Sequence, residues 1–323
     1  MIYQNKYING KTKYKRMVFS IGNKCTAHCK YCDYPKLQKH IQFVTEKNIY
    51  KTFDIFNKLY DIPKYEKILN EFFFRVEGAE IGDVPKNLLD IWFSKENPFQ
   101  IFYNFTNGTF FEKGYYELYK EYIGEIYYHL TKIDEKNINL ILKYQDVIDD
   151  ISIVLVEKDI PKILEHIRKY PDIIWSPYPL LNRKKHNLII ETKYYDKIKV
   201  FLNEPNVFSA FKPILERYNT DEDELKDKRI FCSNDYSHPF INLMTMKIHR
   251  CMASNDSNSI DFTFENMKKY LDNEELLFPP FEDICRNCNN ARVYEENIKN
   301  RKLLELSKVM KKYRNEEINY ESY

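Results

Sequence analysis

The feature that most constrains the fold is an alternation of short apolar segments with longer amphipathic ones, which runs as far as residue 175. Apolar segments of strand length lie at 16–21, 72–76, 100–105, 125–131 and 151–157, and a sixth begins at 172–175. Segments with a helical spacing of apolar residues follow at 46–60, 85–96, 112–122, 136–148 and 160–169. Parallel strands need crossover connections, so the six units predict an α/β fold: a parallel sheet with helices outside, forming a partial (β/α)6 barrel.

The alternation ends after Pro179, and a different organisation is expected beyond it. An irregular hairpin is predicted at 187–201, a helix at 206–218, and an acidic segment at 221–227 is the candidate domain boundary. We therefore expect a core domain over 1–220, with its barrel at 14–180, then a small C-terminal α+β domain over 221–292 and a tail over 293–323. A charged helix at 303–314 is predicted in that tail.

Composition limits the setting and the partners of the chain. The 50 basic and 48 acidic residues nearly balance, which argues against a nucleic-acid partner, because nucleic-acid-binding domains usually carry a basic patch. No apolar run reaches the ~20 residues of a membrane span, and the first 16 residues lack the apolar stretch of a signal peptide. We expect a cytoplasmic, reducing location without a membrane partner, where seven cysteines are metal ligands or catalytic groups rather than disulfides.

Three cysteines lie close together directly after the first predicted strand, in the segment Cys25-Thr-Ala-His-Cys29-Lys-Tyr-Cys32. Cysteine thiolates are the usual ligands of iron–sulfur clusters, and a cubane normally takes four of them. No fourth cysteine lies nearby, so a [4Fe–4S] cluster held here keeps one iron open to a reactant. The alternatives are a zinc site and buried structural cysteines.

This segment resembles the radical S-adenosylmethionine (SAM) superfamily, whose motif is C-x3-C-x2-C after the first strand. The resemblance implies that SAM chelates the open iron through its amino and carboxylate groups. It also implies that an electron from the reduced cluster cleaves SAM to methionine and a 5′-deoxyadenosyl radical. Tyr31, the aromatic residue before the last cysteine, is then expected near the adenine, the alternative being ordinary loop packing.

A second motif follows the second predicted strand. The family places Gly-Gly-Glu there to receive the amino group of SAM, and this chain has Gly78-Ala79-Glu80. Ala79 replaces the second glycine, and Ile81 replaces the proline that usually follows. Small residues permit close approach and a carboxylate suits an ammonium group, so these residues are expected to border SAM; an ordinary strand-end turn is the alternative.

Two more positions on the barrel are expected to contact SAM. Thr106-Asn107-Gly108 ends the third strand and resembles a recurrent feature of the SPASM/twitch branch, which implies that Thr106 and Asn107 face the SAM cleft. Asn-Gly is also a common turn signal. His129 in the fourth strand stands where that branch often carries a serine, and a neutral imidazole can donate a hydrogen bond. Its alternative is a core histidine.

The remaining four cysteines lie at Cys232, Cys251, Cys285 and Cys288. A hairpin over 239–251 is predicted to deliver Cys251. The pattern resembles the twitch domain, a shortened SPASM domain with one auxiliary [4Fe–4S] cluster, although the glycine usual at the hairpin turn is missing. Four cysteines suit a structural zinc ion equally well. A cluster with four thiolates is saturated, so its expected role is moving an electron.

The resemblance implies an oxidoreductase that abstracts hydrogen from a small polar or sugar-like substrate and passes an electron to the auxiliary cluster. An electron donor such as flavodoxin or ferredoxin is implied as a partner. One alternative is an enzyme that modifies a ribosomal peptide, although the 24 residues before Cys25 are expected to be too few for a peptide-recognition domain. Another is a non-enzymatic iron–sulfur or zinc protein. The catalytic acid, base or hydrogen donor is not identified, since Tyr178, His186 and His249 are too generic.

Overall fold

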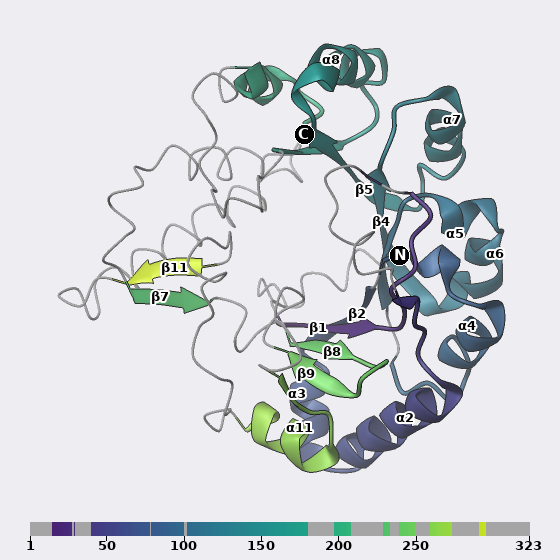
Figure 1. Ribbon diagram of the computed structural model, residues 1–323, viewed down its shortest axis with the longest axis vertical. Coiled ribbons are helices and arrows are strands. Elements are labelled where there is room, and N and C mark those ends of the chain that lie inside the picture. The colour runs from purple at the N-terminus through teal and green to yellow at the C-terminus, as the bar shows by residue number, and fades with distance from the viewer. Residues whose placement is uncertain are drawn as a thin grey trace. The chain divides into compact units, whose positions relative to one another are not determined.

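The computed structural model describes residues 15–27, 29, 40–77, 79–99, 102–179, 197–207, 229–232, 239–249, 259–272 and 291–294. The chain divides into two compact units. Figure 1 labels the helices and strands of both. The first comprises residues 1–154, 173–175 and 234–280. The second comprises residues 155–172, 176–233 and 281–323.

The first unit is built on a sheet whose central strands are parallel. These strands are β1 (Lys15–Ser20), β2 (Phe72–Glu77), β3 (Phe102–Thr106), β4 (Ile123–Leu130) and β5 (Ile148–Leu155). They lie in sequence order, and each pairs in parallel with the next. The predicted parallel arrangement is therefore confirmed for these five strands. The sixth strand, β6 (Trp175–Pro179), begins at Trp175 and not at residue 172 as predicted.

Helices follow the strands as the apolar spacing predicted, with some changes of extent. They are α2 (Glu46–Tyr60), α3 (Pro63–Leu69), α4 (Lys86–Trp92), α5 (Thr109–Glu112), α6 (Tyr115–Tyr119), α7 (Glu135–Lys143) and α8 (Ile160–Lys169). The bounds of α2 and α8 match the predicted ones. The single helix predicted at 112–122 is wrong: Gly114, with φ of 69°, separates α5 from α6, because a left-handed residue ends a helix.

Aromatic packing holds α2 and α4 against one face of the sheet. Phe19 of β1 lies 5.7 Å from Phe56 of α2 and 5.5 Å from Trp92 of α4, measured between ring centroids. Phe74 of β2 stacks beside Phe19 and belongs to the same face. Because side chains alternate along a strand, the neighbours of these residues point to the opposite face.

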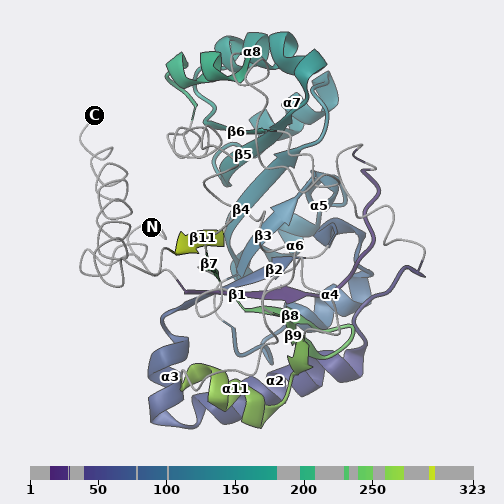
Figure 2. The same ribbon diagram turned by 60° about the vertical axis from the view of Figure 1, so that its left-hand side comes forward.

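The predicted hairpin at 239–251 is confirmed as β8 (Phe240–Asn242) and β9 (Lys247–His249), which pair antiparallel. The glycine missing from its turn is replaced by Met246, whose φ is 53°. The hairpin adds to the edge of the first unit's sheet, since β8 pairs in parallel with β1 and β9 pairs antiparallel with β10 (Ser259–Asp261). An unpredicted helix, α11 (Phe264–Leu271), follows and lies beside α2 and α3 (Figure 2).

The second unit contains α8, whose buried face is Ile160, Ile163 and Ile167. Residues 197–203 form helical turns, including a 3-10 turn over Lys199–Asn203, so the end of the hairpin predicted at 187–201 is wrong. In this unit β7 (Arg229–Cys232) pairs antiparallel with β11 (Ala291–Tyr294). The helix predicted at 206–218 does not begin at 206, since residues 206 and 207 are not helical, and its remainder lies outside the described residues. The predicted segments 221–227 and 303–314 also lie outside them. No helix in the described part of the chain is long and apolar enough to cross a membrane.

Candidate functional site

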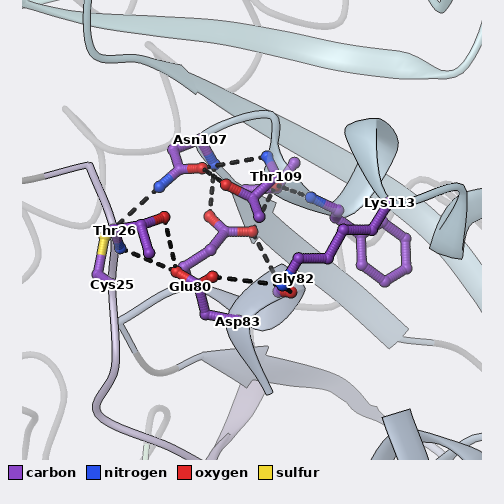
Figure 3. A network of polar contacts seen from close by, with 10 residues as sticks. Cys25, Thr26, Glu80, Gly82, Asp83, Asn107, Thr109 and Lys113 are labelled. Atoms are coloured by element: carbon purple, nitrogen blue, oxygen red, sulfur yellow. Dashed lines mark hydrogen bonds and ion pairs between the residues drawn. The ribbon is translucent and has the colours of Figure 1, made fainter. Parts of the chain in front are cut away.

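Three of the sequence motifs meet at the carboxyl ends of the parallel strands (Figure 3). The chain leaves β1 toward Cys25, leaves β2 toward Glu80, and leaves β3 at Asn107. Neighbouring parallel strands end at the same edge of a sheet, so their following loops lie together. Backbone hydrogen bonds join two of these loops: the Ala79 amide donates to the Gly22 carbonyl at 3.2 Å, and the Glu80 amide donates to the Lys24 carbonyl at 3.1 Å.

Glu80 forms the centre of this site, with 3 % of its surface exposed. Its Oε1 accepts hydrogen bonds from the Gly82 amide at 2.9 Å and the Thr106 hydroxyl at 2.7 Å. Its Oε2 accepts one from the Asn107 amide at 2.6 Å. Burial raises the pKa of Glu80 to about 7, although these hydrogen bonds act in the opposite direction. The carboxylate therefore connects the loops after β2 and β3.

The expected role of Glu80 toward the amino group of SAM stays a prediction. Two carboxylate oxygens together accept about four hydrogen bonds. The described residues supply two to Oε1 and one to Oε2. With these three bonds, the carboxylate has the chemical capacity to accept one more hydrogen bond, at Oε2.

Asn107 links the third motif to the cysteine segment. Its side-chain Nδ2 lies 3.4 Å from Cys25 Sγ and donates to it. Its Oδ1 accepts from both the amide and the hydroxyl of Thr109, at 3.1 Å and 2.7 Å. The next residue, Gly108, has φ of 105°, a conformation that favours glycine. Asn107 therefore belongs to the Asn-Gly turn and also contacts the cysteine segment.

Cys25 and Cys29 have the chemistry that a thiolate-bound iron cluster requires. Both are half-buried on one short segment after β1. Burial raises the pKa of Cys25 to about 11, the Ala27 amide acts to lower it, and the negative charges of Glu80, Cys29 and Asp83 raise it further. A cation bound at this sulfur would offset that negative potential, since a coordinated thiol is deprotonated by the metal. Two of the three predicted cluster ligands, Cys25 and Cys29, are among the described residues, and the iron–sulfur cluster itself stays a prediction.

The contact between Thr26 and Asp83 is a feature that the sequence motifs did not identify. Asp83 Oδ2 accepts hydrogen bonds from the Thr26 amide at 2.8 Å and the Thr26 hydroxyl at 3.0 Å. Lys113 donates to the Gly82 carbonyl at 2.6 Å and lies 3.4 Å from Asp83 Oδ1. Asp83 stands three residues after Glu80, within a 3-10 turn. That spacing is the sequence signal that could have drawn attention to Asp83.

Gly82 permits this turn to pack against the start of α5. A Cβ atom on Gly82 would lie 2.4 Å from the Phe110 amide nitrogen and 2.6 Å from the Thr109 carbonyl carbon. Both atoms belong to the backbone, so neither can move aside without shifting the helix. Gly82, two residues beyond the predicted Gly78-Ala79-Glu80, therefore allows this turn to approach the start of α5 closely.

His129 lies on β4, where its Nδ1 is 2.9 Å from the hydroxyl of Ser152 on β5. Burial lowers the pKa of His129 to about 4, so the ring is neutral at physiological pH. A neutral imidazole carries one donor nitrogen and one acceptor nitrogen, as the expected contact with SAM requires. That contact remains a prediction.

The sheet face opposite α2 and α4 carries charged and aromatic side chains near the same strand ends. Arg75 and Glu77 of β2 form an ion pair there. The Arg75 guanidinium lies 3.6 Å from the centroid of the Phe105 ring, which stacks on Tyr127 at 4.9 Å. Register places His129 on this same face, because it stands two residues after Tyr127. The described side chains on this face therefore include an ion pair and a histidine, whereas those that contact α2 and α4 are aromatic.

The other predicted site residues are only partly placed. His249 is buried in β9 and packs against the ring of Phe240 at 5.9 Å between centroids. Only the backbone of Cys232, in β7, and of Tyr178, in β6, is described. The remaining ones lie outside the described residues: Tyr31, Cys32, Gly78, His186, Cys251, Cys285 and Cys288. Among the side chains that are described, no group of three His, Cys, Asp or Glu could hold a metal ion.

No family model and no curated protein matches this chain.

Proposed function

We propose that this protein is a radical SAM enzyme that cleaves SAM reductively and abstracts hydrogen from a small polar substrate. The observation that supports this best is the contact between Asn107 and Cys25, flanked by the buried Glu80. It brings together segments that the family motifs link to one ligand, from the ends of three adjacent parallel strands. Ligands of open α/β sheets bind outside the carboxyl ends of the strands, which agrees with this location.

In this proposal Cys25, Cys29 and Cys32 hold a [4Fe–4S] cluster through their thiolates. With SAM bound, that cluster supplies a 5′-deoxyadenosyl radical when it receives an electron. Asn107 donates a hydrogen bond to one ligand sulfur, which tunes the potential of an iron–sulfur site. Glu80 holds the loops after β2 and β3 in place and presents Oε2 toward the amino group of SAM.

The polar face of the sheet supports a polar substrate over an apolar one. Arg75, Glu77 and His129 provide charged and hydrogen-bonding groups on one side of the strands, beside the stacked rings of Phe105 and Tyr127. The second set of cysteines, Cys232, Cys251, Cys285 and Cys288, holds the auxiliary cluster that accepts the substrate electron. A cytoplasmic location, with flavodoxin or ferredoxin as electron donor, is part of the same proposal.

The test is an anaerobic assay of SAM cleavage. Protein reconstituted with iron and sulfide is reduced with dithionite, mixed with SAM, and analysed for methionine and 5′-deoxyadenosine. We expect both products in the wild type and neither in the Cys25→Ala and Cys29→Ala variants. The reduced protein should also show an EPR signal that changes when SAM is added. A fully loaded protein that cleaves no SAM and shows an unchanged signal would be a non-enzymatic iron–sulfur protein, and the proposal would fall.

A further inference from the structure

The residue next to the first cysteine is fixed by a carboxylate from another loop. Thr26 follows Cys25 directly, and both of its hydrogen-bond donors, the amide and the hydroxyl, point at the same oxygen of Asp83 (Figure 3). The distances are 2.8 Å and 3.0 Å, and 57 residues separate the partners along the chain. Two donors on one acceptor restrain both the backbone and the side chain of Thr26. The direction in which the cysteine segment leaves Cys25 is thereby set.

Asp83 is itself held firmly. Its side chain is only 3 % exposed, and its amide donates to the Glu80 carbonyl at 3.1 Å within the 3-10 turn η3 (Ile81–Asp83). The second oxygen, Oδ1, faces the ammonium group of Lys113 at 3.4 Å. Lys113 also donates to the Gly82 carbonyl at 2.6 Å. It therefore holds the η3 turn in place and also balances the charge of Asp83.

A buried carboxylate that made only a structural contact would lower the free energy of unfolding. Burial of a charge costs several kcal/mol unless hydrogen bonds and an opposite charge compensate for it. Here the compensation comes from Thr26 on one oxygen and Lys113 on the other. The Thr26 donors belong to the cysteine segment. The hydrogen bonds that compensate for the buried charge of Asp83 therefore also restrain that segment.

We propose that Asp83 is a positioning residue for the iron–sulfur cluster, which holds Thr26, and with it the adjacent Cys25, in place at the start of the cysteine segment. The inference rests on the proposed function in so far as that segment binds a cluster. Three thiolates on a short segment must converge on one cluster, and each residue that is already ordered removes entropy from the binding step. Partners outside the ligand shell commonly change metal affinity 10–100-fold when they are removed.

The experiment compares Asp83→Ala and Asp83→Asn with a matched control, Asp90→Asn. Asp90 accepts hydrogen bonds from a lysine and a hydroxyl, as Asp83 does, but its partners are Lys86 and Tyr119 of α4 and α6. Each variant is reconstituted anaerobically, and iron release to a chelator is followed over time alongside the EPR spectrum and the melting temperature. Asparagine keeps one acceptor oxygen for Thr26, whereas alanine keeps none.

We expect Asp83→Ala to release the iron of this cluster about tenfold faster than wild type and to alter its EPR spectrum. Asp83→Asn should recover most of the retention, while Asp90→Asn should lower the melting temperature with iron release unchanged. Thr26→Val removes the hydroxyl donor and should add little in the Asp83→Ala background, because the two act through one contact.

Wild-type iron release and an unchanged EPR spectrum in Asp83→Ala would overturn the inference, whatever happens to its melting temperature. Additive effects of Thr26→Val and Asp83→Ala would overturn it too. Failure of the proposed function would give a different result. The wild-type protein would bind the cluster, and the variants would differ from it in iron release, yet SAM would leave the EPR signal unchanged. A wild-type protein that loads no cluster on this segment contradicts both.

Discussion

The side-chain amide of Asn107 donates a hydrogen bond to the sulfur of Cys25 over 3.4 Å, although 82 residues separate them in the chain. The parallel register of β1, β2 and β3 makes this contact possible, since it brings the ends of the three strands to one edge. Hydrogen bonds to ligand sulfurs are one of the means by which proteins set the potential of an iron–sulfur cluster.

Asn107→Asp should therefore lower the midpoint potential of the cluster that we propose at Cys25. The substitution removes the donor to Cys25 Sγ and adds a negative charge, and both changes disfavour the more negative, reduced cluster. Asp keeps an oxygen for the Thr109 amide and hydroxyl, so the start of α5 should remain. Asn107→Ala should lower the potential less and lose about 1 kcal/mol of stability, because it lacks that acceptor. An EPR-monitored redox titration measures the midpoint potential of both variants. An unchanged potential in both would contradict a role for this hydrogen bond.

Glu80→Gln should destabilise the protein by about 1–3 kcal/mol. Both carboxylate oxygens accept hydrogen bonds, so the amide NH2 of glutamine would face the Asn107 amide or the donors on Oε1. The control is Glu117→Gln, because Glu117 is exposed and pairs with Lys120 on the surface. Urea unfolding measures both variants. Equal stability of the two would show that the Glu80 network is not a structural connection.

Gly82→Ala should lose about 1–3 kcal/mol of stability and also impair iron retention. The added methyl group meets the backbone of Thr109 and Phe110, which pushes the η3 turn, and with it Asp83, away from Thr26. Gly114→Ala serves as control, since its φ of 69° carries a cost of roughly 1–2 kcal/mol in open space. Thermal melts and iron release separate the two. Similar iron release in both variants would mean that close packing at Gly82 does not support the cysteine segment.

Protonation of His129 should weaken the fold at acid pH. Burial lowers its pKa from 6.5 to about 4, so its stabilising contribution is complete above pH 6.5 and is lost as the pH falls toward 4. A difference of 2.5 pKa units corresponds to about 3 kcal/mol. The stability difference between wild type and His129→Gln should therefore shrink by about that amount between pH 7 and pH 4. Urea unfolding at both pH values tests this, with the exposed His40→Gln as control; a constant difference would contradict the burial effect.

Replacement of Cys285 and Cys288 by Ala should lower iron from about eight to about four atoms per chain, given a cubane at each cysteine set. SAM cleavage should survive at least in part, because the cluster that we propose at Cys25, Cys29 and Cys32 has separate ligands. Substrate oxidation should fail for want of an electron acceptor. Circular dichroism must show that the small domain still folds, since metal binding and folding are coupled. Zinc at this site in anaerobically purified protein would exclude the electron-accepting role.

The sequence alone determined the features that depend on neighbours along the chain. Apolar spacing predicted α2 and α8 with their observed bounds, and the alternation of strands and helices predicted the parallel sheet. It also located the cysteine segment directly after β1 and the β8–β9 hairpin. These predictions succeed because hydrophobic periodicity and turn residues act over a few residues.

Only the tertiary structure decided which distant residues meet. The pairing of β8 with β1, the use of Glu80 as a connection between loops, and the contact of Asp83 with Thr26 each join segments far apart in sequence. Sheet register fixes these contacts to within a residue, and the spacing of Asp83 from Glu80 indicates a turn but does not identify Thr26 as the partner. Short-range spacing therefore predicts the helices and strands, whereas the buried hydrogen bonds around the cysteine segment follow from how the strands align.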